Sequence, residues 1–400
     1  MSKIDEILKN EKIEWKKLWE VTIWDKKFNG VEKHKQKNVK KYHYYLAKEL
    51  KNLIHENGNI RILTTNVTNI YTLEEEVKEN ISNGEIVCIP WGGNPIVQYY
   101  KGRFITGDNR IATSINKEIL DNKFLYYYLL NNIDYIASLY RGSGIKHPDM
   151  YKVLDMEIPI PSIKAQEKIV DILDKFTNYV NELQAELQAE LQARNKQYEY
   201  YRDMLLSEEY LNKRSSELFI KNINSITKCK LKDIATITRG KRLVRSDLEE
   251  IGKFPVFQNS LKPLGYYYDR NFSGDKACVI SAGAAGEIFY REEDFWAADD
   301  VLVINSDTIL NKFIYYFLLS NQRLIKTKVR KASVPRLSRD EVENLEILVP
   351  SMELQKIIVK VLDKFQSLVI DTKGLLLKEI EKRQKQYEYY REKLLDFSKK

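Results

Sequence analysis

Two long stretches of the chain repeat apolar and aromatic residues at the spacing of a coiled coil. The first stretch has seam positions Ile169, Leu173, Phe176, Val180, Leu183, Leu187, Leu191, Arg194, Tyr198, Tyr201 and Leu205. The second has Ile358, Leu362, Phe365, Val369, Thr372, Leu376, Ile380, Arg383, Tyr387, Tyr390 and Leu394. Steps of four and three alternate in both, with one extra step of four at the same place. This spacing predicts two long helices, each with one buried seam.

Shorter apolar runs, separated by Gly, Asn and Asp residues, lie before each long helix. They read GEIVCIP at 84–90, KACVISA at 276–282, EIFY at 287–290 and DVLVIN at 300–305. Runs of this length between turn residues predict strands. One compact amphipathic helix is expected in each half, FLYYYLLNNID at 124–134 and FIYYFLLSNQR at 313–323. The pattern therefore predicts two mixed α/β domains, each followed by a long helix.

The two halves are copies of one another. KQYEYYR at 196–202 recurs at 385–391, and PSIKAQEKIVDILDKF at 161–176 matches PSMELQKIIVKVLDKF at 350–365, with the same separation in both cases. Upstream, GEIVCIPWGG at 84–93 resembles GDKACVISAG at 274–283 at almost this separation, and LWEV at 18–21 resembles LKDI at 231–234 at a larger one. The first copy therefore carries roughly two dozen extra residues, which fall near 31–55.

We expect an α/β fold in which two mixed α/β domains are joined by two long antiparallel coiled-coil helices, with an internal pseudo-two-fold repeat. The antiparallel direction is inferred, because the second helix must return for the two domains to lie at opposite ends. The expected boundaries are a first domain at 1–160, a first helix at 161–215, a second domain at 216–349 and a second helix at 350–400. Pro161 and Pro350 suit a helix start, where Ser162 and Ser351 can act as caps.

Composition narrows the class of protein. The formal net charge of +8 suits a polyanionic partner without proving one. The three cysteines, Cys88, Cys229 and Cys278, lack metal-ligand spacing and indicate a reducing compartment. The stretch MSKIDEILKNEKIEW at 1–15 has no apolar leader region, and no apolar run approaches the roughly 18 residues of a membrane span. We therefore expect a soluble, cytoplasmic protein without membrane contact.

Motifs of a stand-alone enzyme are missing from the sequence. GSGIKHP at 142–148 lacks the Lys-Ser/Thr ending of a phosphate-binding loop, and SAGAAGE at 281–287 is not expected to open a helix. The loop Asn94-Pro95-Ile96-Val97 differs from the Asn/Asp-Pro-Pro-aromatic loop of adenine methyltransferases. The four histidines show no metal-ligand spacing, so no metal site is expected. A nuclease site built from scattered acidic residues stays open.

The paired halves resemble the specificity subunits of type I restriction-modification systems. The resemblance rests on helices that begin with PIPS or VPS, continue through AQ or LQ and LDKF, and reach KQYEYYR, and it covers essentially the whole chain. It implies two target recognition domains, one for each half of a split double-stranded DNA sequence. It also implies helices that set the spacer between the half-sites and dock two methyltransferase subunits.

The resemblance further implies a chain that is not itself catalytic and carries no cofactor. S-adenosylmethionine, ATP and Mg²⁺ would belong to partner subunits: a methyltransferase that methylates adenine and, in complexes that contain one, a motor-nuclease subunit that cleaves unmodified DNA. A coiled-coil protein-interaction scaffold without DNA recognition is the alternative. Salt distinguishes the two, because phosphate contacts make affinity fall steeply with salt concentration.

The tandem ELQAELQAELQA at 182–193 falls where the resemblance places the spacer. Each AELQ unit adds about 6 Å of helix, compared with about 3.4 Å for each base pair. We expect one unit to change the gap between the half-sites by about one or two base pairs. The alternative is that AELQ is only a good helix former, since all four residues have high helix propensity. The second copy fills the same positions with DTKGLLLKEIEK.

The loop after the compact helix is a candidate for DNA contact in both halves, because it combines basic residues with a small flexible patch. In YRGSGIKHPD at 140–149 the candidates are Arg141, Ser143, Lys146 and His147. In VRKASVPRLSRD at 329–340 they are Arg330, Lys331, Ser333, Arg336 and Arg339. A solvated loop without DNA contact is the alternative for any one of them.

The second half also has a denser basic segment, TRGKRLVRS at 238–246, with candidates Arg239, Lys241, Arg242 and Arg245. FQNS at 257–260 adds Gln258 and Asn259, whose amides can pair with adenine, while the matching first-copy stretch is LTTN at 63–66. Different polar residues on a shared scaffold fit two different half-sites. The basic insertion from Lys33 to Lys41 is either a DNA-facing or a disordered surface loop.

The repeated KQYEYYR segments also suggest duplicated docking sites for the two methyltransferase subunits. The candidate docking residues are Tyr198, Tyr201, Tyr387 and Tyr390.

Overall fold

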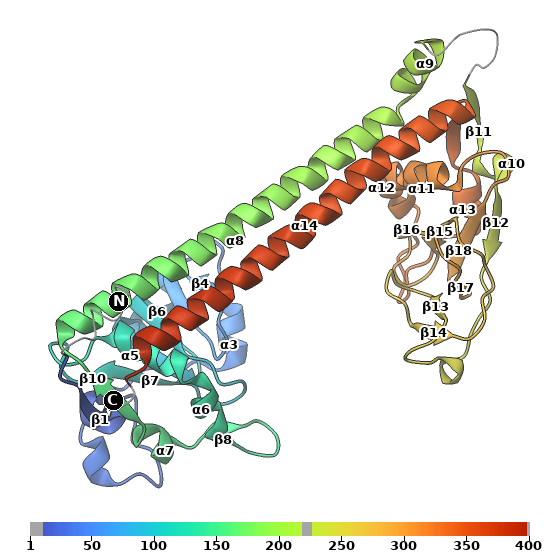
Figure 1. The fold of residues 1–400 in the computed structure, drawn as a ribbon. Coiled ribbons are helices and arrows are strands. Elements are labelled where there is room, and N and C mark those ends of the chain that lie inside the picture. Colours follow the sequence, from blue (N-terminus) through green and yellow to red (C-terminus); the bar gives the residue numbers. More distant parts are fainter. Residues whose placement is uncertain (1–10, 218–225, 398–400) are drawn as a thin grey trace. The chain divides into compact units, whose positions relative to one another are not determined.

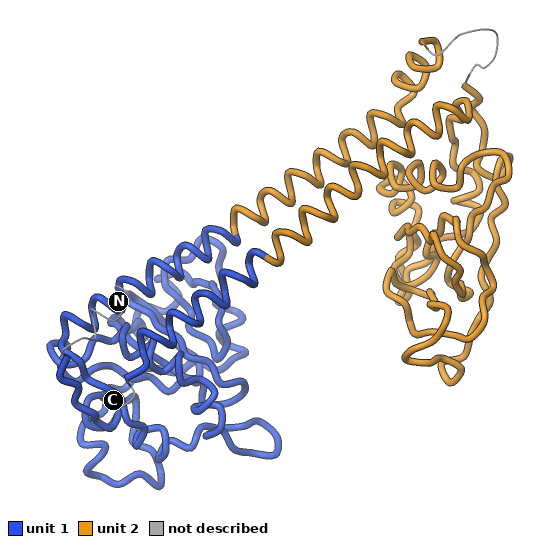
Figure 2. Tube along the Cα trace, in the orientation of Figure 1, with its two compact units in different colours: residues 1–184, 379–400 blue, residues 185–378 orange. Residues whose placement is uncertain are grey.

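The computed structural model describes residues 11–217 and 226–397 (Figure 1). Residues 1–10, which include most of the stretch expected to lack a leader, lie outside the described residues, as do residues 218–225 and 398–400. The chain forms two compact units: unit 1 contains residues 1–184 and 379–400, and unit 2 contains residues 185–378 (Figure 2). Each unit thus combines one α/β body with part of both long helices, and the expected division into four segments stays a prediction.

Unit 1 is built on a six-stranded sheet in the order β2-β7-β5-β6-β3-β4, in which only β3 and β6 run parallel. Its strands are β2 (Thr22–Trp24), β3 (Ile60–Leu63), β4 (Tyr71–Thr72), β5 (Ser82–Pro90), β6 (Gln98–Thr106) and β7 (Asn109–Ser114). Two short pairs are added, β1 (Glu14–Lys17) with β10 (Glu157–Ile160) and β8 (Tyr140–Arg141) with β9 (His147–Pro148). The helices are α2 (Leu18–Val21), η1 (Lys33–Gln36), α3 (Ala47–Asn52), α4 (Glu74–Val77), η2 (Lys78–Asn80), α5 (Asn122–Asn131), α6 (Ile133–Ser138) and α7 (Met150–Leu154).

Unit 2 contains the same layout with its sheet divided in two, β12-β18-β15-β16 and β14-β13-β17. Its strands are β11 (Thr227–Lys230), β12 (Thr236–Arg239), β13 (Phe254–Phe257), β14 (Gly265–Tyr267), β15 (Lys276–Ile280), β16 (Ile288–Arg291), β17 (Trp296–Ala297), β18 (Val301–Asn305) and β19 (Glu346–Val349). Its helices are α9 (Glu208–Glu217), α10 (Leu231–Ile234), η3 (Arg245–Asp247), α11 (Asn311–Ser320), α12 (Gln322–Thr327) and α13 (Arg339–Glu343). The division arises because the long strand β6 of unit 1 corresponds to two separate strands, β16 and β17.

The two long helices are α8 (Ile163–Leu205) and α14 (Met352–Leu395), as the seams predicted. The predicted caps are also confirmed, because the hydroxyl oxygens of Ser162 and Ser351 accept the backbone N–H groups of Ala165 and Leu354, both at 3.3 Å. The glutamine of each AQ or LQ motif is buried beside this cap. Gln166 donates to the carbonyl of Pro161, and Gln355 donates to that of Pro350, both at 2.9 Å.

The LDKF motif connects each long helix to the compact helix that the sequence predicted. In unit 1 the Tyr127 hydroxyl of α5 donates to Asp174 of α8 at 2.6 Å, and Lys123 pairs with the same carboxylate at 2.7 Å. In unit 2 Tyr316 of α11 donates to Asp363 of α14 in the same way. These contacts fix the long helix against α5 or α11, which in turn packs on the sheet and buries the core of each unit.

Within each unit the segments of α8 and α14 pair in antiparallel direction. In unit 1 the rings of Phe176 and Tyr390 stack at 5.2 Å, and Arg383 lies 5.9 Å from the ring of Tyr179. In unit 2 the equivalent pair, Tyr201 and Phe365, stacks at 5.1 Å. Residues with increasing numbers along α8 therefore contact residues with decreasing numbers along α14. The antiparallel inference is confirmed, and each KQYEYYR segment supplies an aromatic contact to one unit.

The first-copy insertion lies between β2 and β3, as the shift in repeat separation predicted. Part of it is packed rather than loose: Lys35 pairs with Asp155 at 2.8 Å, and the buried side chain of Gln36 accepts from the backbone of Phe28 at 2.6 Å. For η1 the disordered alternative is therefore wrong. Because Lys35 is largely buried in an ion pair, it is also unsuited to reach DNA.

Candidate nucleic-acid interface

Unit 2 brings together two of the basic segments that the sequence singled out. Arg239 ends β12, while Arg330 and Arg336 face each other across an isolated antiparallel bridge, with Arg330 N–H donating to the Arg336 carbonyl at 2.8 Å. All three arginines line one pocket of about 230 Å³, together with Ser281, Ala282, Asp300, Leu337 and Ser338. The side chains come from segments far apart in the chain, and the fold makes them neighbours.

The other candidates of unit 2 differ in how closely they belong to this pocket. Lys241 follows Arg239 and donates its backbone N–H to Ala297 at 2.9 Å. Gln258 reaches the pocket, because its amide nitrogen lies 3.5 Å from a carboxylate oxygen of Asp300. Asn259 is exposed beside it. Arg242, Arg245, Lys331 and Ser333 are exposed on the adjoining loops but do not line the pocket.

Arg339 differs from the three arginines that line the pocket, because it has an acidic partner. It lies at the start of α13, and its guanidinium forms an ion pair with Glu343 one helical turn later at 2.5 Å. An intrahelical pair of this kind is exposed and weak. Its guanidinium is thus already engaged, unlike those of Arg239, Arg330 and Arg336, which have no ion pair or side-chain hydrogen bond to another described residue.

Unit 1 has the corresponding hairpin, β8 with β9, and all four predicted residues lie on it or in its loop. Arg141 and His147 pair across the hairpin, while Ser143 and Lys146 are exposed between them. The Arg141 guanidinium lies 3.5 Å from the carboxylate of Asp149. The Lys146 carbonyl accepts from Gly93, which holds the loop after β5 against the hairpin.

Trp91 is the centre of this region in unit 1, and sequence reasoning missed it. Its carbonyl lies 2.7 Å from Nδ1 of His147, and the two rings are 5.1 Å apart. The ammonium of Lys26 lies 5.2 Å from the indole ring, and the guanidinium of Arg110 lies 4.7 Å from it. An indole surrounded by cations is a surface on which bases and cations can stack.

A buried ion pair lies beneath Trp91. Arg110 pairs with Asp25 at 2.9 Å, both side chains are almost fully buried, and Asp25 also accepts from the backbone of Ile111 and from the hydroxyl of Tyr44. Burial, and then the Asp25 carboxylate, raise the pKa of Tyr44 well above its usual value, so this hydroxyl keeps its proton as donor. Tyr44 belongs to the first-copy insertion, which is thereby tied to the base of the candidate interface.

The same positions build the candidate interface in both units. Trp91 N–H donates to the Asp108 carbonyl at 2.9 Å, and Ser281 N–H donates to the Asp300 carbonyl at 2.7 Å. The hairpin residues Arg141 and His147 correspond to Arg330 and Arg336, because they have the same separation as the two KQYEYYR segments. Lys26 corresponds to Arg239, because the two have the same separation as LWEV and LKDI. Sequence reasoning missed Lys26, and this separation is the signal that could have found it.

The predicted docking tyrosines lie between the paired helices. Tyr387 is buried in the core of unit 1, Tyr198 packs against the core of unit 2, and Tyr201 and Tyr390 form the stacked pairs described above. The fold therefore already uses these rings within the chain, and their role in docking stays a prediction. Tyr389, which belongs to the same KQYEYYR segment, is half-exposed.

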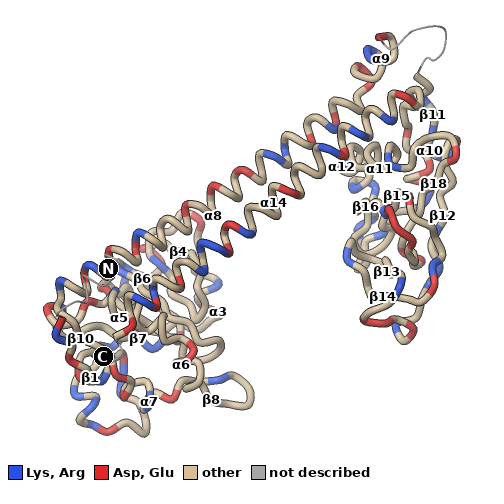
Figure 3. The backbone as a smooth tube through the Cα atoms, viewed as in Figure 1, with Lys and Arg blue, Asp and Glu red and all other residues tan. Residues whose placement is uncertain are grey.

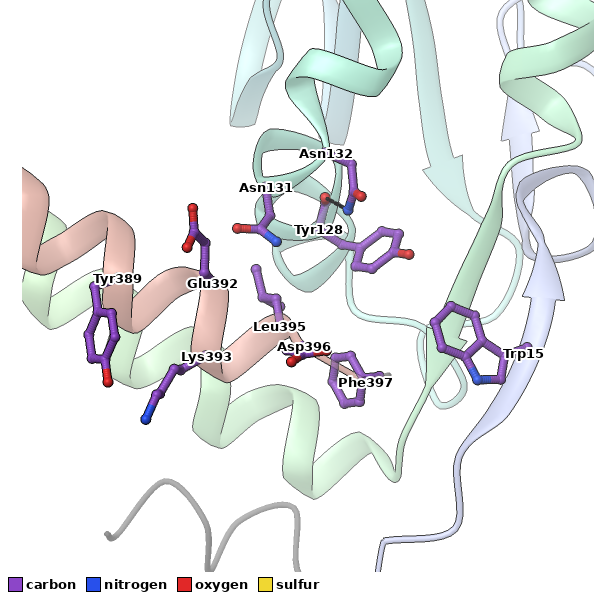
Figure 4. Close-up of a pocket in the computed structure, with 10 residues that line it drawn as sticks. All are labelled: Trp15, Tyr128, Asn131, Asn132, Tyr389, Glu392, Lys393, Leu395, Asp396 and Phe397. Carbon is purple, nitrogen blue, oxygen red and sulfur yellow. Dashed lines mark hydrogen bonds between the residues drawn. The ribbon is translucent and has the colours of Figure 1, made fainter. Parts of the chain in front are cut away.

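Tyr389 borders a pocket of about 500 Å³ at the end of α14 in unit 1 (Figure 4). Aromatic, amide and charged side chains line it: Trp15, Tyr128, Asn131, Asn132, Tyr389, Glu392, Lys393, Leu395, Asp396 and Phe397. The equivalent pocket in unit 2 is smaller, about 190 Å³, and Leu211 of α9 forms part of its wall. Basic and acidic residues both occur along α8 and α14 (Figure 3).

No group of three or more His, Cys, Asp or Glu side chains within residues 11–217 and 226–397 is arranged to hold a metal ion. In these same ranges no helix has both the length and the apolar character of a membrane span.

Comparison with known proteins agrees with the duplicated architecture. The family model described as "Type I restriction modification DNA specificity domain" matches twice, at residues 29–193 and 224–382. A Haemophilus influenzae protein, itself assigned by inference as a type I restriction enzyme specificity subunit, is 30% identical over 99% of this chain and 98% of its own length. A type I restriction enzyme specificity subunit of Escherichia coli is 27% identical over 100% of this chain and 98% of its own length.

A solved chain from a type I restriction-modification system covers 97% of this chain and 98% of its own length, with a TM-score of 0.67 and 13% identity. At that identity the similarity supports the fold alone.

Proposed function

Because the chain belongs to the type I restriction modification DNA specificity family, we propose that it is the specificity subunit of a type I restriction-modification complex and that each unit reads one half of a split DNA sequence. The observation that carries this proposal is the same candidate interface built twice from different side chains. Unit 1 offers Lys26, Trp91 and His147 where unit 2 offers Arg239, Ser281 and Arg336. The same backbone arrangement with different side chains is what recognition of two different half-site sequences requires.

The contacts within each interface divide into two kinds. Exposed lysines and arginines on the loops, such as Lys146, Lys241 and Arg242, are suited to phosphates, which position the protein without reading sequence. The side chains that line the pocket or surround Trp91 are suited to base edges. The proposed assignment therefore makes the loop residues responsible for affinity and its salt dependence, and the pocket residues responsible for specificity.

Partner subunits complete the proposed complex. Two methyltransferase subunits would dock on the duplicated helix pairs, and motor-nuclease subunits would join in a cleaving complex. A specificity subunit has a non-catalytic role in this family. In the proposal S-adenosylmethionine, ATP and Mg²⁺ are therefore bound by the partners, and the adenine chemistry takes place on the methyltransferase.

The test is coexpression with the methyltransferase subunit of the proposed complex, followed by genome-wide mapping of N6-methyladenine. We expect one bipartite motif with a fixed number of unspecified base pairs. Coexpression without this chain should give no motif. A purified chain that cuts DNA or hydrolyses ATP alone would contradict the non-catalytic assignment. A chain that does not bind DNA at low salt, and whose binding to a protein partner does not weaken as salt rises, would instead favour the protein-interaction scaffold.

A further inference from the structure

The pocket of unit 2 that Arg239, Arg330 and Arg336 line holds an unusual set of polar residues. These three arginines line it together with Asp300. Among the described residues no ion pair joins the Asp300 carboxylate to any of them, and it accepts only one long hydrogen bond, from Gln258 at 3.5 Å. Other arginines of unit 2, such as Arg270 and Arg291, have acidic partners. The pocket therefore presents donors and an acceptor that the fold does not use.

The residues of unit 1 that correspond to Arg330 and Asp300 form ion pairs within unit 1. Arg141, the counterpart of Arg330, pairs with Asp149, whereas unit 2 has Ser338 at the position of that acid. Asp108, the counterpart of Asp300, pairs with Arg110, whereas unit 2 has Leu302 at the position of that arginine. At these two positions unit 2 therefore lacks the acid that would pair with Arg330 and the arginine that would pair with Asp300. Ser281 in place of Trp91 leaves room beside these two unpaired groups.

A phosphate does not suit this set of groups. A carboxylate repels a phosphate at close range, and at neutral pH it can only accept hydrogen bonds. A base-pair edge does suit it, because the major-groove edge of a G·C pair has two acceptors on guanine, O6 and N7, beside the N4 amino donor of cytosine. Arginine matches the two guanine acceptors with its forked donors, and aspartate accepts from the cytosine amino group.

We propose that unit 2 reads a G·C base pair in the major groove through this pocket. The guanidinium groups of the Arg330–Arg336 bridge, with Arg239 beside them, donate to O6 and N7 of guanine, and Asp300 accepts from N4 of cytosine. This inference rests on the proposed function and adds the identity of one base pair to it. Unit 1, whose counterpart residues Arg141 and Asp108 already pair with Asp149 and Arg110, reads its half-site without this contact.

Single substitutions in the assembled methyltransferase complex test the residues. Arg330→Ala, Arg336→Ala and Asp300→Asn should each reduce the preference for G·C over A·T at one position of one half-site, roughly 10- to 100-fold for the arginine that contacts guanine. The other half-site and the gap should not change. Arg141→Ala and Asp108→Asn are the matched controls in unit 1, and they should leave that G·C position as selective as in the unsubstituted chain.

Modified DNA tests the same contact on the unsubstituted complex, where folding of a variant is not in question. A duplex with 7-deazaguanine at the proposed position lacks N7 and should bind at least several-fold more weakly, whereas inosine keeps O6 and N7 and should bind like guanine. Equal binding of all three duplexes would overturn the inference, as would a unit 2 half-site without a G·C pair. Either result leaves the bipartite motif intact, whereas absence of any bipartite motif would contradict the proposed function itself.

Discussion

Two equivalent tyrosines, Tyr127 and Tyr316, connect the compact helix of each unit to the long helix. Each hydroxyl donates to the aspartate of an LDKF motif. Tyr316→Phe should therefore lower the free energy of unfolding by about 1–2 kcal/mol, because a hydrogen bond to a carboxylate is lost while the ring remains. Chemical denaturation measures the change. Tyr200→Phe is the matched control, since Tyr200 is two-thirds exposed. Equal effects of the two substitutions would contradict the assigned contact.

Cysteine reactivity tests the two cores separately. Burial raises the pKa of the Cys88 thiol to about 12, and burial raises that of Cys278 even further above its usual value. At pH 8 both thiols stay protonated and shielded, so a thiol reagent should label only the half-buried Cys229 quickly in the native protein. All three should react after denaturation. Fast labelling of two or three cysteines without denaturant would contradict the burial of Cys88 in β5 or of Cys278 in β15.

The sequence allowed some of these residues to be found and not others. Repetition marked the LDKF motifs of Asp174 and Asp363 and the compact helices as shared elements, because both recur at the separation of the two KQYEYYR segments, but their contact is seen only in the structure. The hairpin residues were also found, because a loop rich in basic residues can be recognised from the sequence alone. Asp300 and Trp91 could not be found in this way. Their importance comes from neighbours on other strands, which only the folded sheet brings within reach.

The AELQ repeat is the element whose length, rather than its contacts, is expected to matter. Ala185, Glu186 and Gln188 are exposed, and Leu187 is only half-buried. Deleting Ala185 to Gln188 shortens α8 by about 6 Å and turns its far end by about 40° beyond a full turn. Neither candidate interface loses a side chain, so both half-site sequences should stay the same. The gap between them should fall by one or two base pairs in a methylation map.

Leu187→Ala is the matched control for that deletion, because it removes the apolar side chain and keeps the helix length. It should leave the gap unchanged. A duplicated unit should lengthen the gap by the same one or two base pairs. An active deletion variant with an unchanged gap would refute the ruler interpretation and leave good helix propensity as the explanation for the repeat.

At the scale of the whole molecule, the duplication predicts the stoichiometry of the complex. Both units contain the same helix pair and the same stacked aromatic contact, so two methyltransferase subunits should bind one copy of this chain. Native mass spectrometry at saturation gives the count. Tyr198→Ala with Tyr201→Ala removes packing only from unit 2, and Tyr387→Ala with Tyr390→Ala only from unit 1. Each pair should weaken one docking event, and a single methyltransferase on the unsubstituted chain would contradict the duplication argument.

Independent reading by the two units is the central claim, and one methylation map of reciprocal variants tests it most directly. One variant carries Arg239→Ala, Lys241→Ala and Arg242→Ala in unit 2, and the other carries Lys26→Ala and His147→Ala in unit 1. Each variant should relax or abolish recognition of a different half of the bipartite motif, while the remaining half and the gap stay as they are. Loss of sequence preference in both halves from either variant, with the complex still assembled, would contradict the claim.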